Sequence, residues 1–382
     1  TVAGIVGALL LYRPGSARRA PLHALAIAVL AVLLLGAAPA LSLFHFQPED
    51  PLGLAGEPDE QGPRRLASGE GDQRQVQRGE GDPLGLRQGE GGDGDVQMDS
   101  VPFRDEYSRD GAQQPVAVVL LHDDVEPRGG AFYFRQVAFS VWNGRRLVRS
   151  YDARVDRDVF DGFPSVGPVE VPAPPDSGSR RSIPTTVSLL RDHVHPPVLA
   201  DGVRIEPPRT ADPALFTRTY RAVSSVFTGS TNELLGLEAG NPDWPRSVWQ
   251  TYTSVPEDPR YQELADRIVD NIRPTFRTDP WARALSVGLW LEQNTQYSLR
   301  SQHASASDPT GSYLFGDRIG YCVHLAHAGA YLMRAAGLPA RVAAGYAYDA
   351  ANRSGGGTLL LRAGDAHAWA EVYLDGVGWV PV

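Results

Sequence analysis

The chain of 382 residues contains no lysine and a single cysteine, Cys322. All 36 basic residues are therefore arginines, and 45 acidic residues outnumber them to give a formal net charge of −9. This acidic balance argues against nucleic-acid binding by bulk electrostatics, so we expect no nucleic-acid partner. One cysteine cannot form an internal disulfide, so cysteine content does not indicate the cellular compartment. The length allows two globular domains and additional segments.

Two apolar runs near the start of the chain predict contact with a membrane. Residues 1–12 resemble the end of a membrane helix, and residues 22–44 are long enough for a hydrocarbon core, which takes about 20 residues. The arginine-containing loop between them is expected to be cytoplasmic, since basic loops stay inside. We therefore predict transmembrane segments within residues 1–44, anchorage to the cell membrane, and an extracytoplasmic location for everything after Phe44. A cleaved signal peptide is the alternative, and it would export the rest of the chain as well.

Residues 45–114 are rich in Gly, Asp, Glu, Gln, Arg and Pro, and Gly-Glu-Gly recurs every ten residues at 69–71, 79–81 and 89–91. Such a segment has too little apolar surface to form a core, so we predict a flexible acidic Gly-rich linker. Acidic Gly-rich repeats can bind calcium, but these do not place ligand oxygens at the spacing of calcium loops.

Residues 115–230 have the pattern of a small antiparallel β-sandwich-like domain. Apolar runs at 116–121 and 132–142 predict strands, and the Asn143-Gly144 pair that follows is a strong hairpin signal. We expect this domain to position or recognise a partner.

Histidines in this region raise the question of a metal site. His122-Asp123-Asp124 and His193-Val194-His195 contain suitable ligands, but nothing in the sequence brings the two groups together. We interpret them as surface polar residues.

Two helices are predicted ahead of the cysteine. Apolar residues Leu264, Ile268 and Ile272 recur at four-residue spacing in the first, residues 259–272. The second opens with Thr278-Asp279-Pro280, a cap candidate followed by proline at the first helical position, and carries Leu285, Leu289 and Trp290. Residues 298–321 then form a long loop, which we expect to be one wall of a substrate cleft.

Cys322 lies where that loop turns into a helix, which Gly337-Leu338-Pro339 ends. In a first helical turn, unpaired backbone N–H groups and the positive end of the helix dipole stabilise a thiolate. The position therefore predicts a nucleophilic cysteine, although a lone cysteine is also commonly a small buried apolar residue.

A strand that carries His367 is predicted 45 residues after Cys322. Its side chains alternate, with His367, Trp369, Glu371 and Tyr373 on one face. A histidine on a strand behind a helix-borne cysteine can take the thiol proton. Further strands at 340–348, 358–361 and 379–382, with a glycine turn between the first two, predict an antiparallel sheet and an α+β fold for residues 231–382.

Three sequence blocks strengthen this interpretation. They are Gly-Tyr-Cys-Val-His-Leu-Ala-His-Ala, then Met-Arg-Ala-Ala-Gly-Leu-Pro-Ala-Arg-Val-Ala-Ala-Gly-Tyr, then Asp-Ala-His-Ala-Trp-Ala-Glu-Val-Tyr-Leu with Gly-Trp-Val-Pro after it. In this order they resemble the core of the transglutaminase-like family, part of the papain-like cysteine superfamily, and the resemblance extends from about residue 264 to the end of the chain. It implies a bacterial membrane-anchored transglutaminase-like protein in which Cys322 is the nucleophile and His367 the base.

The family's third catalytic residue, an aspartate, follows the Gly-Trp-Val-Pro strand. The resemblance therefore implies that it lies just beyond Val382, and that residues 231–382 are a C-terminally truncated domain; Asp375 is a poor substitute. Because the chain also begins with threonine, we interpret it as an internal piece of a longer protein.

The implied chemistry is acyl transfer on peptide or glutamine amides through a thioester, with a peptide or protein as substrate and without a cofactor or a metal. Water as acceptor gives a peptidase or amidase, and an amine gives cross-linking; the sequence does not choose. We expect the N–H of Cys322 to be one oxyanion donor. A side chain such as Trp290 or Tyr297 could be a second, but we interpret both first as core residues.

Two other classes of function remain. Cys322, His324 and His327 could be read as metal ligands, but Cys322 and His324 point to nearly opposite sides of a helix. The chain could also be a non-catalytic exported binding or scaffold module that keeps the transglutaminase-like fold.

Overall fold

The computed structural model describes residues 99–107, 111–176, 178–208, 214–353 and 355–382, and these belong to one compact unit. The transmembrane segments predicted within residues 1–44, and residues 45–98 of the predicted linker, lie outside the described residues. Among the residues described, no helix combines the length and the apolar character needed to cross a membrane.

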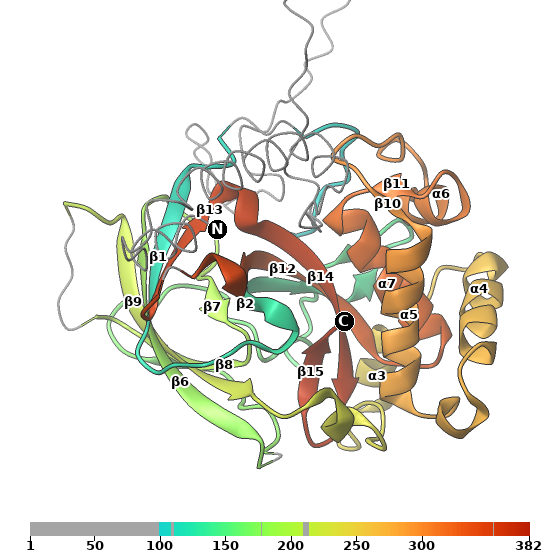
Figure 1. The fold of residues 1–382 in the computed structure, drawn as a ribbon, viewed down its shortest axis with the longest axis horizontal. Helices are drawn as coiled ribbons and strands as arrows, with labels where there is room; N and C mark the ends of the chain where they lie inside the picture. The colour runs from blue at the N-terminus through green and yellow to red at the C-terminus, as the bar shows by residue number, and fades with distance from the viewer. Residues whose placement is uncertain (1–98, 108–110, 177, 209–213, 354) are drawn as a thin grey trace, which may run out of the picture. The chain divides into compact units, whose positions relative to one another are not determined.

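Two antiparallel sheets make up most of the β structure (Figure 1). Their strands are β1 Pro115–Leu121, β2 Ala131–Phe139, β5 Val169–Glu170, β6 Arg180–Leu189, β7 Val198–Leu199, β8 Gly202–Glu206, β9 Arg218–Phe227, β12 Ala340–Asp349, β13 Thr358–Arg362, β14 Ala366–Leu374 and β15 Gly378–Pro381. The six-stranded sheet has the order β13-β1-β6-β9-β8-β5, and the five-stranded sheet has the order β15-β14-β12-β2-β7. Two short pairs complete the set: β3 Val141–Trp142 with β4 Leu147–Val148, and β10 Gln296–Tyr297 with β11 Ile319–Gly320.

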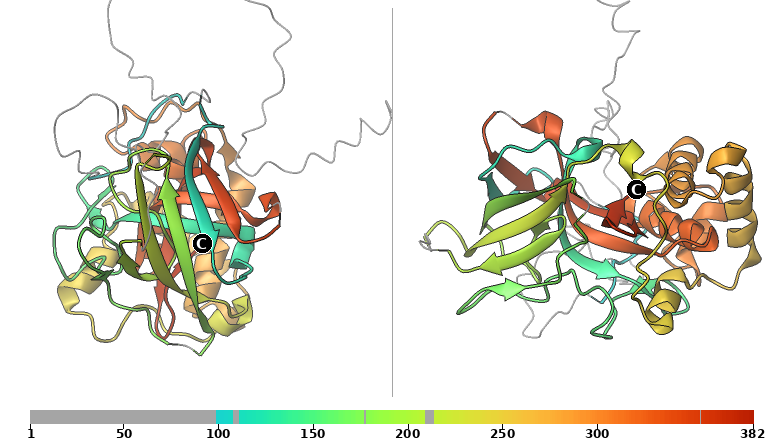
Figure 2. Two further views of the ribbon diagram at one scale, coloured as in Figure 1. Left: turned by 90° about the vertical axis from the view of Figure 1, so that its left-hand side faces the viewer. Right: turned by 90° about the horizontal axis from the view of Figure 1, so that it is seen from below.

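The helices lie on one face of the five-stranded sheet, and the six-stranded sheet covers the other (Figure 2). They are α3 Arg246–Thr253, α4 Pro259–Asp270, α5 Pro280–Asn294, α6 Pro309–Phe315 and α7 Cys322–Ala335, with 3-10 turns η1 Arg128–Gly130, η2 Thr231–Leu234, η3 Pro274–Phe276, η4 Ala350–Asn352 and η5 Ala363–Asp365. Asp258, Asp279 and Asp308 cap α4, α5 and α6 by accepting a backbone N–H of the first turn, and a proline follows each. The predicted start of α5 is therefore confirmed.

The two predicted domains share both sheets. β1 pairs with β13, and β2 pairs with β12, so strands from residues 115–230 lie beside strands from residues 231–382. The strands of residues 115–230 therefore do not form a sandwich by themselves, because both sheets include strands from residues 231–382. The prediction that 358–361 joins the sheet of 340–348 is wrong, because β13 adds to the six-stranded sheet instead.

Local predictions have mixed outcomes. The Asn143-Gly144 hairpin is confirmed as β3 and β4, with Gly144 at a φ of 91°. Two of the apolar residues named for α5, Leu285 and Leu289, are 38% and 45% exposed. The buried positions of α5 are Trp281, Ala284, Val287 and Leu291. The predicted loop 298–321 contains α6 and β11.

The central helix α7 packs tightly on β14. A Cβ atom added at Gly329 would lie 3.2 Å from the Cβ of Ala370, so only a residue without a side chain fits there comfortably. Nearly the whole of α7 is buried, from Cys322 to Ala335. This close approach fixes the helix that begins with Cys322 against the strand that begins beside His367.

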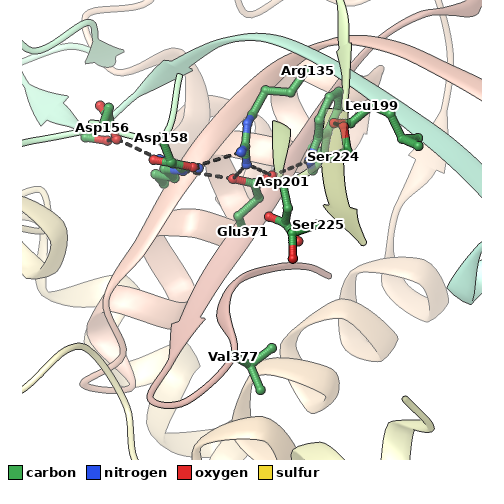
Figure 3. Close-up of polar contacts among 12 residues, drawn as sticks. Arg135, Asp156, Asp158, Leu199, Asp201, Ser224, Ser225, Glu371 and Val377 are labelled. Carbon is green, nitrogen blue, oxygen red and sulfur yellow. Dashed lines mark hydrogen bonds and ion pairs between the residues drawn. The ribbon is translucent and has the colours of Figure 1, made fainter. Parts of the chain in front are cut away.

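A buried ionic network holds the opposite face of the same sheet (Figure 3). Glu371 of β14 is completely buried, and it accepts hydrogen bonds from Arg135 Nη1 at 3.0 Å and from Arg341 Nε at 2.8 Å. The two guanidinium groups also bind Asp158, at 2.8 Å and 2.7 Å. Burial alone would raise the pKa of Glu371, but Arg135 and Arg341 outweigh it and lower that pKa. Three strands and the loop that carries Asp158 are therefore tied together by charge.

Removing one member of this network should destabilise the fold strongly. We expect Arg341→Met to lower the free energy of unfolding by about 3–5 kcal/mol, because it leaves buried carboxylates without their cation. Urea unfolding at neutral pH measures this. Arg154→Met is the matched control, since Arg154 pairs with Asp152 at the surface and should change stability little. Equal, small effects of the two substitutions would contradict a stabilising role for the network.

Candidate active site

Cys322 is the first residue of α7, and Tyr321 is the N-cap. The prediction that the cysteine lies in the first helical turn is confirmed. Its side chain is nearly covered, with 5% exposure.

The thiol is surrounded by hydrogen-bond donors. Hydrogen bonding from the backbone N–H of Ala368, the hydroxyl of Tyr297 and the N–H groups of Val323 and Cys322 favours the thiolate. Burial has the larger effect, however, and raises the pKa of the thiol to about 11. The prediction is therefore right that N–H groups of the first helical turn favour the thiolate. It is wrong about the direction of the pKa shift, because burial by the tertiary structure has the larger effect.

His367 lies near the beginning of β14, opposite Gly345 of β12. Its ring is nearly parallel to that of Trp369, with an interplanar angle of 13° and 6.3 Å between ring centroids, and it is 6.5 Å from the ring of Tyr133. Burial lowers the pKa of His367 to about 4, so the imidazole is neutral at pH 7 and can accept a proton.

The structure brings the two predicted catalytic residues to neighbouring positions. The thiol of Cys322 contacts the amide of Ala368, which is joined by a peptide bond to His367. Within the described chain, no hydrogen bond joins the thiol and the imidazole. The Cys322–His367 pairing therefore stays a prediction, supported by this backbone contact.

The candidates for the third catalytic residue and for the second oxyanion donor lie in different parts of the structure. Asp375 follows the far end of β14, eight residues from His367, which is roughly 25 Å along a strand. The aspartate expected after Val382 lies outside this sequence. Of the two donor candidates, Tyr297 reaches the thiol, whereas the ring of Trp290 lies 5.3 Å beneath the guanidinium of Arg318.

The pairing of β10 with β11 explains the position of Tyr297. The two strands are parallel, with Tyr297 opposite Gly320, and Ser298 N–H donates to the carbonyl of Gly320 at 2.6 Å. Tyr297 is thereby held beside Gly320, which precedes Cys322 by two residues. The sequence offered Tyr297 only as one of two aromatic candidates, because nothing local reveals a parallel pair in which Tyr297 lies opposite Gly320.

The two histidines of α7, His324 and His327, lie in the core. No group of three or more potential metal ligands occurs among the residues described. His324 Nδ1 accepts the N–H of Tyr321 at 3.4 Å, and His327 Nδ1 donates to the carbonyl of Val323 at 2.9 Å. Both rings are fully buried, and burial lowers their pKa values to about 3 and about 4. They are neutral core residues.

The histidines of residues 115–230 are also held separately. His193 and His195 are each 5% exposed, so the interpretation as surface residues is wrong for them. His193 bonds to the hydroxyl of Tyr346 at 2.8 Å, and His195 to the carbonyl of Asp161 at 2.9 Å. His122 bonds to Thr186 at the surface.

The thiol pKa leads to a pH dependence for labelling. Below about pH 11, the thiolate fraction rises about tenfold per pH unit. We therefore expect the rate constant for alkylation by iodoacetamide to rise roughly tenfold per unit between about pH 7 and about pH 10. Mass spectrometry of the intact protein measures it without ambiguity, because the chain has one cysteine. A plateau already present near neutral pH would indicate a thiolate–imidazolium pair and contradict the raised pKa.

Comparisons with known proteins match the part of the chain that carries this candidate site. Residues 262–382 match the family model described as transglutaminase-like superfamily. A protein-glutamine gamma-glutamyltransferase of Pseudomonas aeruginosa PAO1 is 34% identical over 142 residues, which are 36% of this chain and 20% of that protein. Protein YebA of Bacillus subtilis 168, described as uncharacterized, is 37% identical over 76 residues, which are 19% of this chain and 10% of that protein. The chain thus spans one fifth or less of the length of these curated relatives.

Among solved structures, the periplasmic domain of TgpA from Pseudomonas aeruginosa has a TM-score of 0.44 and 21% sequence identity, covering 71% of this chain and 87% of that chain. Residues 262–382, which carry both Cys322 and His367, are a transglutaminase-like superfamily domain.

Proposed function

We propose that this protein is a thiol-dependent acyltransferase acting on peptide or glutamine amides through Cys322 and His367. The observation that carries the proposal is the surroundings of the thiol. Cys322 begins a buried helix, four hydrogen-bond donors favour its thiolate form, and one of them is the amide next to His367. The relative named as a protein-glutamine gamma-glutamyltransferase supports the choice of substrate class.

The first half of the reaction forms a thioester. Neutral His367 takes the thiol proton, and the sulfur attacks the carbonyl carbon of the substrate amide. The carbonyl oxygen then carries a negative charge, which the N–H of Cys322 and the hydroxyl of Tyr297 stabilise. When the C–N bond breaks, the imidazolium returns its proton to the leaving nitrogen, so ammonia or an amine departs.

The second half releases the acyl group. Water or a primary amine attacks the thioester while His367 takes its proton, and the sulfur leaves as a thiolate that the same proton neutralises. Water yields an acid, and an amine yields a new amide. Cys322 supplies the nucleophile, His367 carries the proton, and water or an amine accepts the acyl group, so the reaction needs no cofactor.

We further propose that the site works outside the cytoplasmic membrane on a peptide or protein. This location rests on the apolar runs at residues 1–12 and 22–44 in the sequence. Anchorage of the protein by these runs is part of the same proposal.

A second candidate function is that of a non-catalytic exported binding or scaffold module. The covered thiol of Cys322 and its pKa of about 11 favour this alternative, since a resting nucleophile is more commonly exposed and acidic.

Incorporation of a fluorescent primary amine into a glutamine-rich protein, together with release of ammonia, tests the two candidates. We expect activity that Cys322→Ala and His367→Asn each lower by about 10³-fold or more, because nucleophile and base act as a unit. His122→Asn is the control, since His122 bonds to Thr186 at the surface. Absence of both products would leave the non-catalytic alternative, whereas full activity of Cys322→Ala would exclude Cys322 as the nucleophile.

Tyr297→Phe tests the oxyanion assignment. Loss of one donor should lower kcat by about 10²-fold and leave KM almost unchanged, because the interaction strengthens only as charge develops on the oxygen. Tyr348→Phe, which removes a hydroxyl bonded to the carbonyl of Asn352, should retain the normal kcat. An unchanged kcat in Tyr297→Phe would exclude Tyr297 from the oxyanion site.

A further inference from the structure

A short segment far upstream of the transglutaminase-like domain packs on the start of α7. We call residues 99–107 the strap. Val101, Phe103 and Tyr107 of the strap are 0%, 9% and 6% exposed, although the sequence places them in the predicted linker. The strap is therefore part of the folded unit that contains the candidate site.

The strap is fixed by hydrogen bonds to the chain that follows Tyr297. Residues 299–304, directly after β10, exchange backbone and side-chain hydrogen bonds with it. These are Tyr107 N–H to Leu299 C=O (3.1 Å), Ser301 N–H to Asp105 C=O (2.8 Å), Ser301 Oγ to Arg104 C=O (3.0 Å) and Ala304 N–H to Asp105 Oδ1 (3.0 Å). The strap thus holds the segment that follows Tyr297, one of the donors to the thiol.

The other side is held through the hydroxyl of Tyr321, the residue before Cys322. Tyr321 is completely buried, and its oxygen accepts the N–H of Arg104 at 2.8 Å. It is 3.3 Å from the hydroxyl of Tyr107, which itself donates to the carbonyl of Pro102 at 3.2 Å. The two rings meet edge to face with centroids 4.6 Å apart. A buried chain of hydrogen bonds therefore leads from the strap to the N-cap of α7.

Phe103 adds an apolar contact to the same turn. Its ring centroid is 5.0 Å from that of His324 and 4.9 Å from that of His327. His324 in turn accepts the N–H of Tyr321, so the ring that Phe103 touches also caps the helix. The strap contacts both the N-cap and the first two turns of the nucleophile's helix.

We propose that Tyr107 and Tyr321 are positioning residues for Cys322, through which the strap keeps the thiol buried and aimed at its donors. The expected effect on kcat rests on the proposed function, whereas the expected effect on the accessibility of the thiol does not. Without either hydroxyl, buried polar groups lose a partner, and the first turn of α7 can relax away from Ala368 and Tyr297. The thiol then becomes more accessible while the site loses its catalytic geometry.

Paired measurements on Tyr107→Phe and Tyr321→Phe test this inference. We expect alkylation of Cys322 by iodoacetamide at neutral pH to become about tenfold faster, while kcat for amine incorporation falls about tenfold at unchanged KM. The apparent thiol pKa from the pH–rate profile should move down from about 11. A merely structural role would lower the urea midpoint without moving either rate at a temperature where the variants are folded.

Tyr151→Phe is the matched control. The Tyr151 hydroxyl donates to Asp99 of the same strap, but its ring is 72% exposed and does not reach Tyr321. Both rates should remain at their wild-type values in this variant. Tyr107→Phe leaves Tyr321 in place, so it decides the inference if Tyr321→Phe fails to fold.

The two proposals fail in different ways. Faster alkylation in Tyr107→Phe supports the strap even if the wild-type protein transfers no acyl group, which would overturn only the proposed function. Wild-type values of both the alkylation rate and kcat in folded Tyr107→Phe would overturn the strap and leave the proposed function standing.

Discussion

The candidate site depends on the Glu371 carboxylate, because its hydrogen bonds hold the strand that carries His367. It is buried in the middle of β14 and receives hydrogen bonds from Arg135, Arg341 and the indole of Trp369, the last at 3.0 Å. The strand that presents His367 and the amide of Ala368 is thereby tied to its neighbour β12 and, beyond it, to β2. A carboxylate held by two guanidinium groups cannot shift without exposing unpaired charge to an apolar interior, so β14 is a rigid support.

The candidate site is assembled from segments that lie far apart in the chain. α7 supplies the thiol, β14 the imidazole and the Ala368 amide, and β10 the Tyr297 hydroxyl, while the strap holds two of these three. The sheets that support them draw strands from both residues 115–230 and residues 231–382. The sheets of the transglutaminase-like domain at residues 262–382 therefore include strands from residues that the family model does not match.

Features set by local chemistry could be predicted from the sequence, and features set by burial or long-range pairing could not. Asp279-Pro280 marked the start of α5, and Cys322 was placed at a helix start, because caps and helix ends depend on adjacent residues. The partner of Glu371, Arg135, is 236 residues away, and Tyr107 is 214 residues from Tyr321. The thiol pKa was missed for the same reason, since its largest cause is burial by the whole fold. Tyr297 was named as a candidate, but its choice over Trp290 required the β10–β11 register.

The central claim, that the sulfur of Cys322 and the imidazole of His367 work on one carbonyl group, is tested most directly by a crystal structure of a covalent adduct. A peptide whose glutamine amide is replaced by a halomethyl ketone would alkylate the thiol and keep a carbonyl oxygen beside it. We expect that oxygen about 3 Å from the backbone nitrogen of Cys322 and from the Tyr297 hydroxyl, with a His367 ring nitrogen within about 4 Å of the sulfur. An adduct whose oxygen meets neither donor, with the His367 ring out of reach of the sulfur, would contradict the account.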